Sequence, residues 1–105
     1  MASPSKSKGN RLENKIVQMA QEAGIKAVRA WGSNGKSLGL TDDVDVLMGA
    51  FKVQAKARKA IADYIKPPPG ADITIVQEIR KGHTEEPLAV LPLRLLLEIL
   101  KIKGA

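Results

Sequence analysis

The sequence predicts a small α/β domain in which a central mixed sheet of about five strands is flanked by helices. Apolar residues recur at helical spacing in residues 10–23 and 92–102, and they alternate with polar residues between Asp42 and Lys56. A chain of 105 residues can build one hydrophobic core but not two. We therefore expect one domain over residues 10–105, preceded by a flexible basic arm, residues 1–9, whose small polar side chains cannot pack.

Composition narrows the functional classes. The net charge is +6, and the whole surplus of Lys and Arg lies in residues 1–59. A basic half-domain is typical of proteins that bind phosphate backbones, although basic surfaces also aid solubility. The absence of cysteine excludes disulfides and thiolate zinc sites. With no signal-peptide core, and no apolar run that approaches the length of a membrane span, such as the short run Leu95–Leu97, we expect a soluble cytoplasmic protein.

Residues 10–23 predict an amphipathic helix that ends at Gly24. Glu13 lies inside the apolar arc of its helical wheel, between Leu12 and Val17. A carboxylate directed towards a core needs a partner, such as a metal or a cation. The alternative is a helix cap, with Asn10 as the N-cap and Glu13 in the first turn.

Residues 25–31 predict a strand, and residues 32–40 form a glycine-rich loop that contains Ser33 and Lys36. Such a loop can present backbone N–H groups and a lysine to phosphate. A plain flexible loop is an equally good interpretation of the same residues.

The segment from Asp42 to Lys56 predicts a hairpin with a tight turn at residues 48–50. Because alternate strand side chains share a face, one face of the hairpin gathers carboxylates, an amide and ammonium groups. These side chains are Asp43 and Asp45 from the first strand and Lys52, Gln54 and Lys56 from the second. Asp43 is either a supplementary ligand or an ordinary turn residue.

The remaining residues predict a helix at 57–66, stopped by the prolines at 67–69, and then strands at 72–79 and 88–91. His83 falls in the loop between these strands, and we interpret it as solvated because no second His or Cys accompanies it. The helix at 92–102 is apolar over more than half of its circumference. It therefore needs cover on two sides, from its own sheet and from a second subunit.

Taken together, the motifs in residues 8–59 resemble those of archaeal-type Holliday junction resolvases, which belong to the PD-(D/E)xK nuclease superfamily. The residues that carry this resemblance follow the family's order and spacing: Lys8-Gly9, Glu13, Ala27-Val28-Arg29, Gly32-Ser33, Val44-Asp45-Val46 and Gln54-Ala55-Lys56.

The resemblance implies a homodimeric endonuclease that makes symmetric nicks in four-way DNA junctions by Mg²⁺-dependent phosphodiester hydrolysis, with Mn²⁺ as a substitute. It implies catalytic roles for Glu13, Ser33, Asp45, Gln54 and Lys56. Of these, Glu13, Asp45 and Gln54 would lie at the metal. The residues expected to contact DNA are Lys8, Arg11, Arg29, Lys36, Arg58 and Lys59.

Two positions depart from the family pattern. Gln54 stands where an acid is usual, and Asn14 stands where an arginine commonly follows the helix glutamate. An amide oxygen can coordinate a hard cation but brings no charge, so we expect weaker metal binding. Two alternatives therefore stay open: a non-catalytic module that binds branched DNA, and a repair or restriction-type nuclease that acts on linear duplex DNA.

Overall fold

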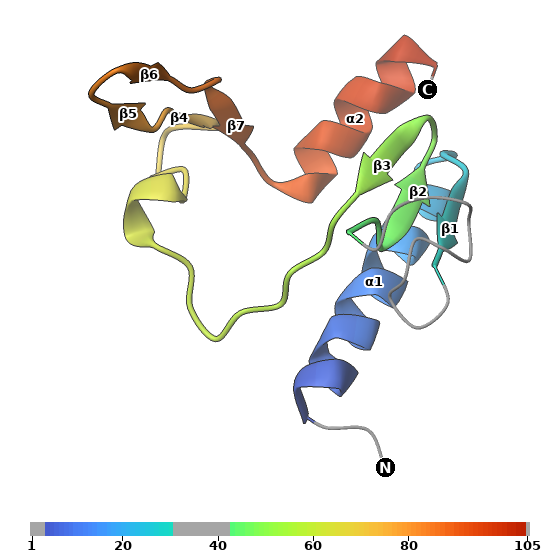
Figure 1. Ribbon diagram of the computed structural model, residues 1–105. Helices are drawn as coiled ribbons and strands as arrows, with labels where there is room; N and C mark the ends of the chain where they lie inside the picture. The colour runs from blue at the N-terminus through green and yellow to red at the C-terminus, as the bar shows by residue number, and fades with distance from the viewer. Residues whose placement is uncertain (1–3, 31–42, 105) are drawn as a thin grey trace. The chain divides into compact units, whose positions relative to one another are not determined.

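The computed structural model describes residues 4–30 and 43–104 of this small α/β protein (Figure 1). These residues form two α-helices and several short antiparallel strands. The chain divides into two compact units. The first contains the described residues up to Ala57 together with those from Leu97 onward, and the second is Arg58–Leu96. Each unit is described separately.

The first unit consists of helix α1 (Pro4–Glu22), a three-stranded sheet and the second half of helix α2 (Leu93–Lys103). The strands are β1 (Ala27–Arg29), β2 (Val46–Met48) and β3 (Phe51–Val53), in the order β1-β2-β3 with antiparallel pairing throughout. Helix α1 contacts β1 and β2. The turn between β2 and β3 falls at Gly49 and Ala50, which confirms the predicted hairpin, and Gly49 has a φ of 60° that favours glycine.

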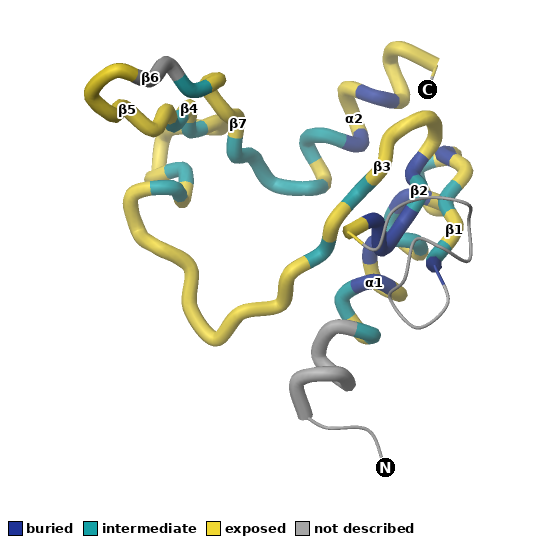
Figure 2. The backbone as a smooth tube through the Cα atoms, in the orientation of Figure 1, coloured by how far each residue is buried: buried dark blue, intermediate teal, exposed yellow. Residues whose placement is uncertain are grey.

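The hydrophobic core lies where α1 meets this sheet, as the buried parts of the tube in Figure 2 show. Its members come from α1, the sheet and α2: Ile16, Ala20, Ile25, Ala30, Val44, Val46, Met48, Leu97 and Leu100. Val46 and Met48 are two residues apart on β2 and both are buried, as the alternation of strand side chains requires.

Helix α1 is longer than predicted at its N-terminus. It begins at Pro4 and not at Asn10, so residues 4–9 belong to the helix and Asn10 is not its cap. Proline is favoured in the first turn because its missing N–H has no helical partner there. The C-terminus is as predicted: Gly24 has a φ of 80°, its N–H donates to Gln21, and the N–H of Ile25 donates to Ala20.

The second unit contains two separate strand pairs and a short 3₁₀-helix, η3 (Asp63–Ile65). Strand β4 (Thr74–Val76) pairs with β7 (Leu88–Val90), and β5 (Ile79–Arg80) pairs with β6 (His83–Thr84). None of the residues whose burial is described in this unit is buried (Figure 2).

Several predicted elements are therefore wrong or shortened. The helix at 57–66 is absent apart from η3, because a short helix depends on burying an apolar face, and Ile61 and Tyr64 are exposed. The strand at 72–79 splits into β4 and β5, and the predicted loop after it is part of the β5–β6 hairpin. The strand predicted for 25–31 is regular only over Ala27–Arg29.

The single sheet of about five mixed strands is also wrong for the described residues. Their strands form one three-stranded sheet and two separate pairs, all antiparallel. The described strands of the second unit pair only with one another, β4 with β7 and β5 with β6, and none of them pairs with the first sheet. In contrast, β7 and α2 lie where the sequence predicts them. Neither helix in the described ranges is long and apolar enough to cross a membrane.

Candidate functional site

Asp45 joins the ends of the three strands of the first unit. Its backbone N–H donates to the carbonyl of Val53 at 2.8 Å, and its carbonyl accepts a hydrogen bond from the N–H of Ala30 at 2.9 Å. Its side-chain Oδ2 accepts from the N–H of Ala55 at 2.7 Å. Gln54 lies in sequence between these two partners, Val53 at the end of β3 and Ala55 just beyond the strand.

Burial explains why this carboxylate binds a backbone N–H. Asp45 is only 8% exposed, and a buried carboxylate is costly unless donors satisfy it. The regular pairing of β2 with β3 ends at Val46 and Val53, and beyond it Asp45 bonds to Val53 and Ala55, the two neighbours of Gln54 in sequence. The side chains of Gln54 and Lys56 are exposed.

Glu13 and Arg29 form a second polar centre between α1 and β1. Glu13 is 2% exposed, and its Oε1 accepts a hydrogen bond from Nε of Arg29 at 3.0 Å. The other guanidinium nitrogens donate to α1 as well: Nη2 to Oδ1 of Asn10 at 2.9 Å and Nη1 to Oδ1 of Asn14 at 3.1 Å. The sequence predicts that this buried carboxylate has a metal or a cation as its partner, and in the structure a cation, Arg29, is a partner.

Arg29 was expected to contact DNA, and in the structure it is engaged with α1 instead. Its three bonds reach residues at positions i, i+3 and i+4 of one helix, which share a face. A planar guanidinium is suited to such a convergent set of acceptors. Asn10 and Asn14 therefore have a structural role that the sequence reasoning missed, although their spacing from Glu13 was a usable signal.

The other predicted DNA-contacting residues differ in how far the structure describes them. Arg11, Arg58 and Lys59 are exposed and accessible to a polyanion. Lys8 belongs to α1, but its side chain lies outside the described residues. Ser33 and Lys36 also lie outside the described residues. Asp43 is exposed, in contrast to Asp45.

In the described part of the chain, few charged side chains near Asp45 are available to bind a metal ion. Within residues 4–30 and 43–104, no group of three or more His, Asp or Glu side chains is placed to hold a metal ion. Asp45 brings a carboxylate to this region, and Gln54, the residue before its bonded partner Ala55, brings an amide oxygen. Two such oxygens suit a hard cation that keeps most of its water or takes phosphate oxygens as further ligands.

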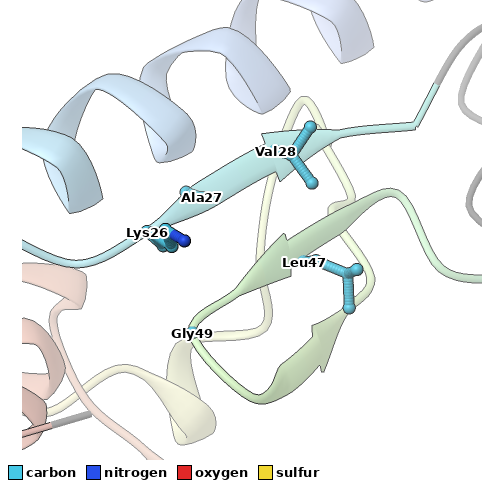
Figure 3. Close-up of a pocket in the computed structure, with 5 residues that line it drawn as sticks. All are labelled: Lys26, Ala27, Val28, Leu47 and Gly49. Carbon is cyan, nitrogen blue, oxygen red and sulfur yellow. The ribbon is translucent and has the colours of Figure 1, made fainter.

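A shallow cavity of about 350 Å³ lies on the same three-stranded sheet, and the sequence reasoning did not anticipate it. It is lined by Lys26, Ala27, Val28, Leu47 and Gly49 (Figure 3). Its lining is mostly apolar, with one lysine at the edge.

Comparisons of the chain with known protein families, with curated protein sequences and with solved structures found no match. The function of this protein is therefore inferred from its residues and their geometry.

Proposed function

We propose that this protein is a metal-dependent endonuclease that cuts branched DNA, with four-way junctions as its substrate and a homodimer as its active form. The observation that supports this best is the hydrogen bond from the N–H of Ala55 to Oδ2 of Asp45. It brings the aspartate of one strand to the Gln54-Ala55-Lys56 segment of the next, which is the arrangement that the resemblance to junction resolvases implies.

The donor set fits a weakly bound Mg²⁺. Oδ1 of Asp45 and the amide oxygen of Gln54 would hold the ion, and water and a DNA phosphate would complete its coordination. Mg²⁺ in such a site lowers the pKa of a bound water and offsets charge on the reacting phosphate. With one carboxylate in place of two, we expect the metal to bind tightly only when DNA supplies phosphate oxygens.

The chain's own groups have distinct tasks in this proposal. Asp45 is fixed by three hydrogen bonds, so its free carboxylate oxygen keeps a constant position at the end of the sheet. Lys56 follows Ala55 directly and is exposed, so its ammonium group can approach the scissile phosphate. There it orients the attacking water or stabilises the negative charge that develops on the phosphate oxygens.

A second candidate function is a branched-DNA-binding module without catalysis. It is favoured by the engagement of Glu13 with Arg29, because a glutamate held by a guanidinium is a poorer metal ligand than a solvated one. In this alternative the basic first half of the chain binds DNA phosphates and Asp45 serves only to connect strands.

The decisive experiment compares an immobile four-way DNA junction with a linear duplex of the same sequence, each with Mg²⁺ and with a chelator. We expect paired nicks in the junction alone, and only with Mg²⁺. Asp45→Asn and Lys56→Ala should each lower the cleavage rate by at least about 100-fold, since one removes a metal ligand and the other a charge-stabilising group.

The matched control for Lys56→Ala is Lys81→Ala, which removes an exposed lysine from the second unit. Junction affinity of the Asp45 and Lys56 variants should stay within about threefold of the wild type, because many phosphate contacts share the binding energy. Full activity in either variant would refute the assignment of the active site. Tight junction binding without nicks under Mg²⁺ or Mn²⁺ would instead establish the non-catalytic module.

A further inference from the structure

The three-stranded sheet has one face that is turned away from α1. The register pairs Val28 with Leu47 and Leu47 with Lys52, so these three side chains form a row across one face. Arg29, the next residue after Val28, bonds to α1, which places α1 on the opposite face. We call the face that carries Val28, Leu47 and Lys52, together with Lys26, the outer face.

The outer face is apolar at its centre and recessed. Val28 is 48% exposed although it is a branched aliphatic residue in the middle of a strand. Val28 and Leu47 line the cavity of about 350 Å³, with Lys26 at one end and Gly49 at the turn (Figure 3). The backbone closes the recess there, because the N–H of Gly49 donates to the carbonyl of Lys26 at 2.6 Å.

Two lysines flank this recess: Lys26 and Lys52 are exposed on its two sides. Among the described residues, no acid lines it. Of the acids nearest in sequence, Asp45 is buried and bonded to Ala55, whereas Glu22 and Asp43 are exposed and are not among its lining residues. The surface therefore suits an anionic partner that also has apolar groups to bury.

From these observations we infer that the outer face binds a single DNA strand, with its phosphates at Lys26 and Lys52 and an unpaired nucleotide over Val28 and Leu47. Strand spacing and rise place the Cα atoms of the two lysines about 12 Å apart, so two flexible side chains can reach phosphates a few nucleotides apart. An unpaired strand exposes the apolar surfaces of its bases, whereas a duplex conceals them by stacking.

The outer face and the candidate active site share the β2–β3 hairpin, which connects the single-strand site to the proposed cleavage. In the row formed by Val28, Leu47 and Lys52, Leu47 lies two residues after Asp45 and Lys52 lies two residues before Gln54. A strand bound on the outer face would thus continue towards Asp45. The inference rests on the proposed action on DNA, and it adds a site for the unpaired strand that a branch point supplies.

The experiment measures fluorescence anisotropy of the full chain with a labelled 20-nucleotide single strand and with a 20-base-pair duplex. Lys26→Glu and Lys52→Glu should each weaken single-strand binding by about tenfold and reduce the salt dependence by about one counterion. The matched control is Lys15→Glu, which makes the same charge change at an exposed position of α1 and should weaken binding less than about threefold. Val28→Ser should weaken single-strand binding more than duplex binding.

Equal losses for Lys15→Glu, Lys26→Glu and Lys52→Glu would overturn the inference, because binding would then follow net charge alone. Equal effects of Val28→Ser on both DNA forms would also overturn it. A third probe, vesicles of phosphatidylserine and phosphatidylcholine, tests another anionic surface, and binding to vesicles without binding to the single strand would contradict the inference. Junction cleavage is measured separately. If the wild type cuts the junction but Lys26→Glu and Lys52→Glu bind the single strand as well as the wild type does, only the outer-face site is refuted. If the wild type does not cut the junction but single-strand binding depends on these lysines, only the nuclease is refuted.

Discussion

Arg29 connects the first sheet to α1 through polar contacts. Its guanidinium makes hydrogen bonds to three side chains of the helix, including the buried carboxylate of Glu13. A methionine at this position keeps an unbranched apolar side chain and removes every donor. The expected loss falls on stability, because a buried carboxylate would lose a charged partner.

We expect Arg29→Met to lower the free energy of unfolding by about 2–3 kcal/mol, the usual contribution of hydrogen bonds to a charged group. Urea denaturation followed by circular dichroism measures this difference. Arg11→Met, at an exposed position of α1, is the control and should change the free energy of unfolding by less than about 0.5 kcal/mol. If both variants were equally stable, the bonds from Arg29 to α1 would not contribute to folding.

Gln54 is the residue at which the proposed metal site differs from the pattern of the junction resolvases that the sequence resembles. Gln54→Glu adds a carboxylate between Val53 and Ala55, the two residues that bond to Asp45, and should lower the Mg²⁺ concentration for half-maximal cleavage by about tenfold, because a second negative charge strengthens cation binding. The titration is made with junction DNA at fixed ionic strength.

Ala50→Glu is the control for this change, since it adds the same charge at the exposed turn of the same hairpin. It should leave the Mg²⁺ titration unchanged. An unchanged titration for Gln54→Glu as well would show that residue 54 is not a ligand.

Helix α2 has two kinds of apolar residue, and they should respond differently to truncation. Leu100 is buried, whereas Ile102 is 86% exposed. Leu100→Ala should reduce the free energy of unfolding by about 2–4 kcal/mol through lost burial and a cavity. Ile102→Ala should change it by less than about 0.5 kcal/mol at protein concentrations low enough for the proposed dimer to dissociate, and thermal or urea melts of the two variants under that condition provide the comparison. Similar losses for both under that condition would contradict the difference in burial between Leu100 and Ile102.

Among the helices and strands, the sequence predicts best those elements that depend only on neighbouring residues. The β2–β3 hairpin was predicted because alternation and a glycine turn act over a few neighbouring residues. The helix predicted at 57–66 failed because helix propensity is weak without an apolar face to bury. Its Ile61 and Tyr64 remain exposed, so nothing in the second unit supports a helix there.

Across the described residues, large apolar side chains are exposed in both units. In α2 they are Ile99 and Ile102, and in the second unit they are Ile61, Tyr64, Ile73, Ile75, Ile79 and Leu88. In the proposed homodimer, some of them would be covered and two related sites would cut the two strands of a symmetric junction.

Light scattering after size exclusion tests this proposal, and we expect twice the 11.3 kDa mass of one chain. Ile99→Glu and Ile102→Glu together should produce a monomer that stays folded, because both residues are exposed before substitution. Lys101→Glu, an exposed position on the same helix, is the control and should leave the dimer intact. A monomeric wild type would refute the dimer, and an intact dimer in the double variant would exclude α2 as the interface.

The amino-acid sequence is sufficient to predict α1 from Asn10 onward, the β2–β3 hairpin, β7 and α2, and to bring Asp45 close to the segment of residues 54–56. Each of these depends on periodicity or a turn within one short segment. The sequence does not reveal that Arg29 binds α1, that β4 and β7 pair apart from the first sheet, or that Val28 and Leu47 line a recess between lysines. Those features depend on contacts between distant segments, and pairwise contacts of this kind leave no periodic signal in a single sequence.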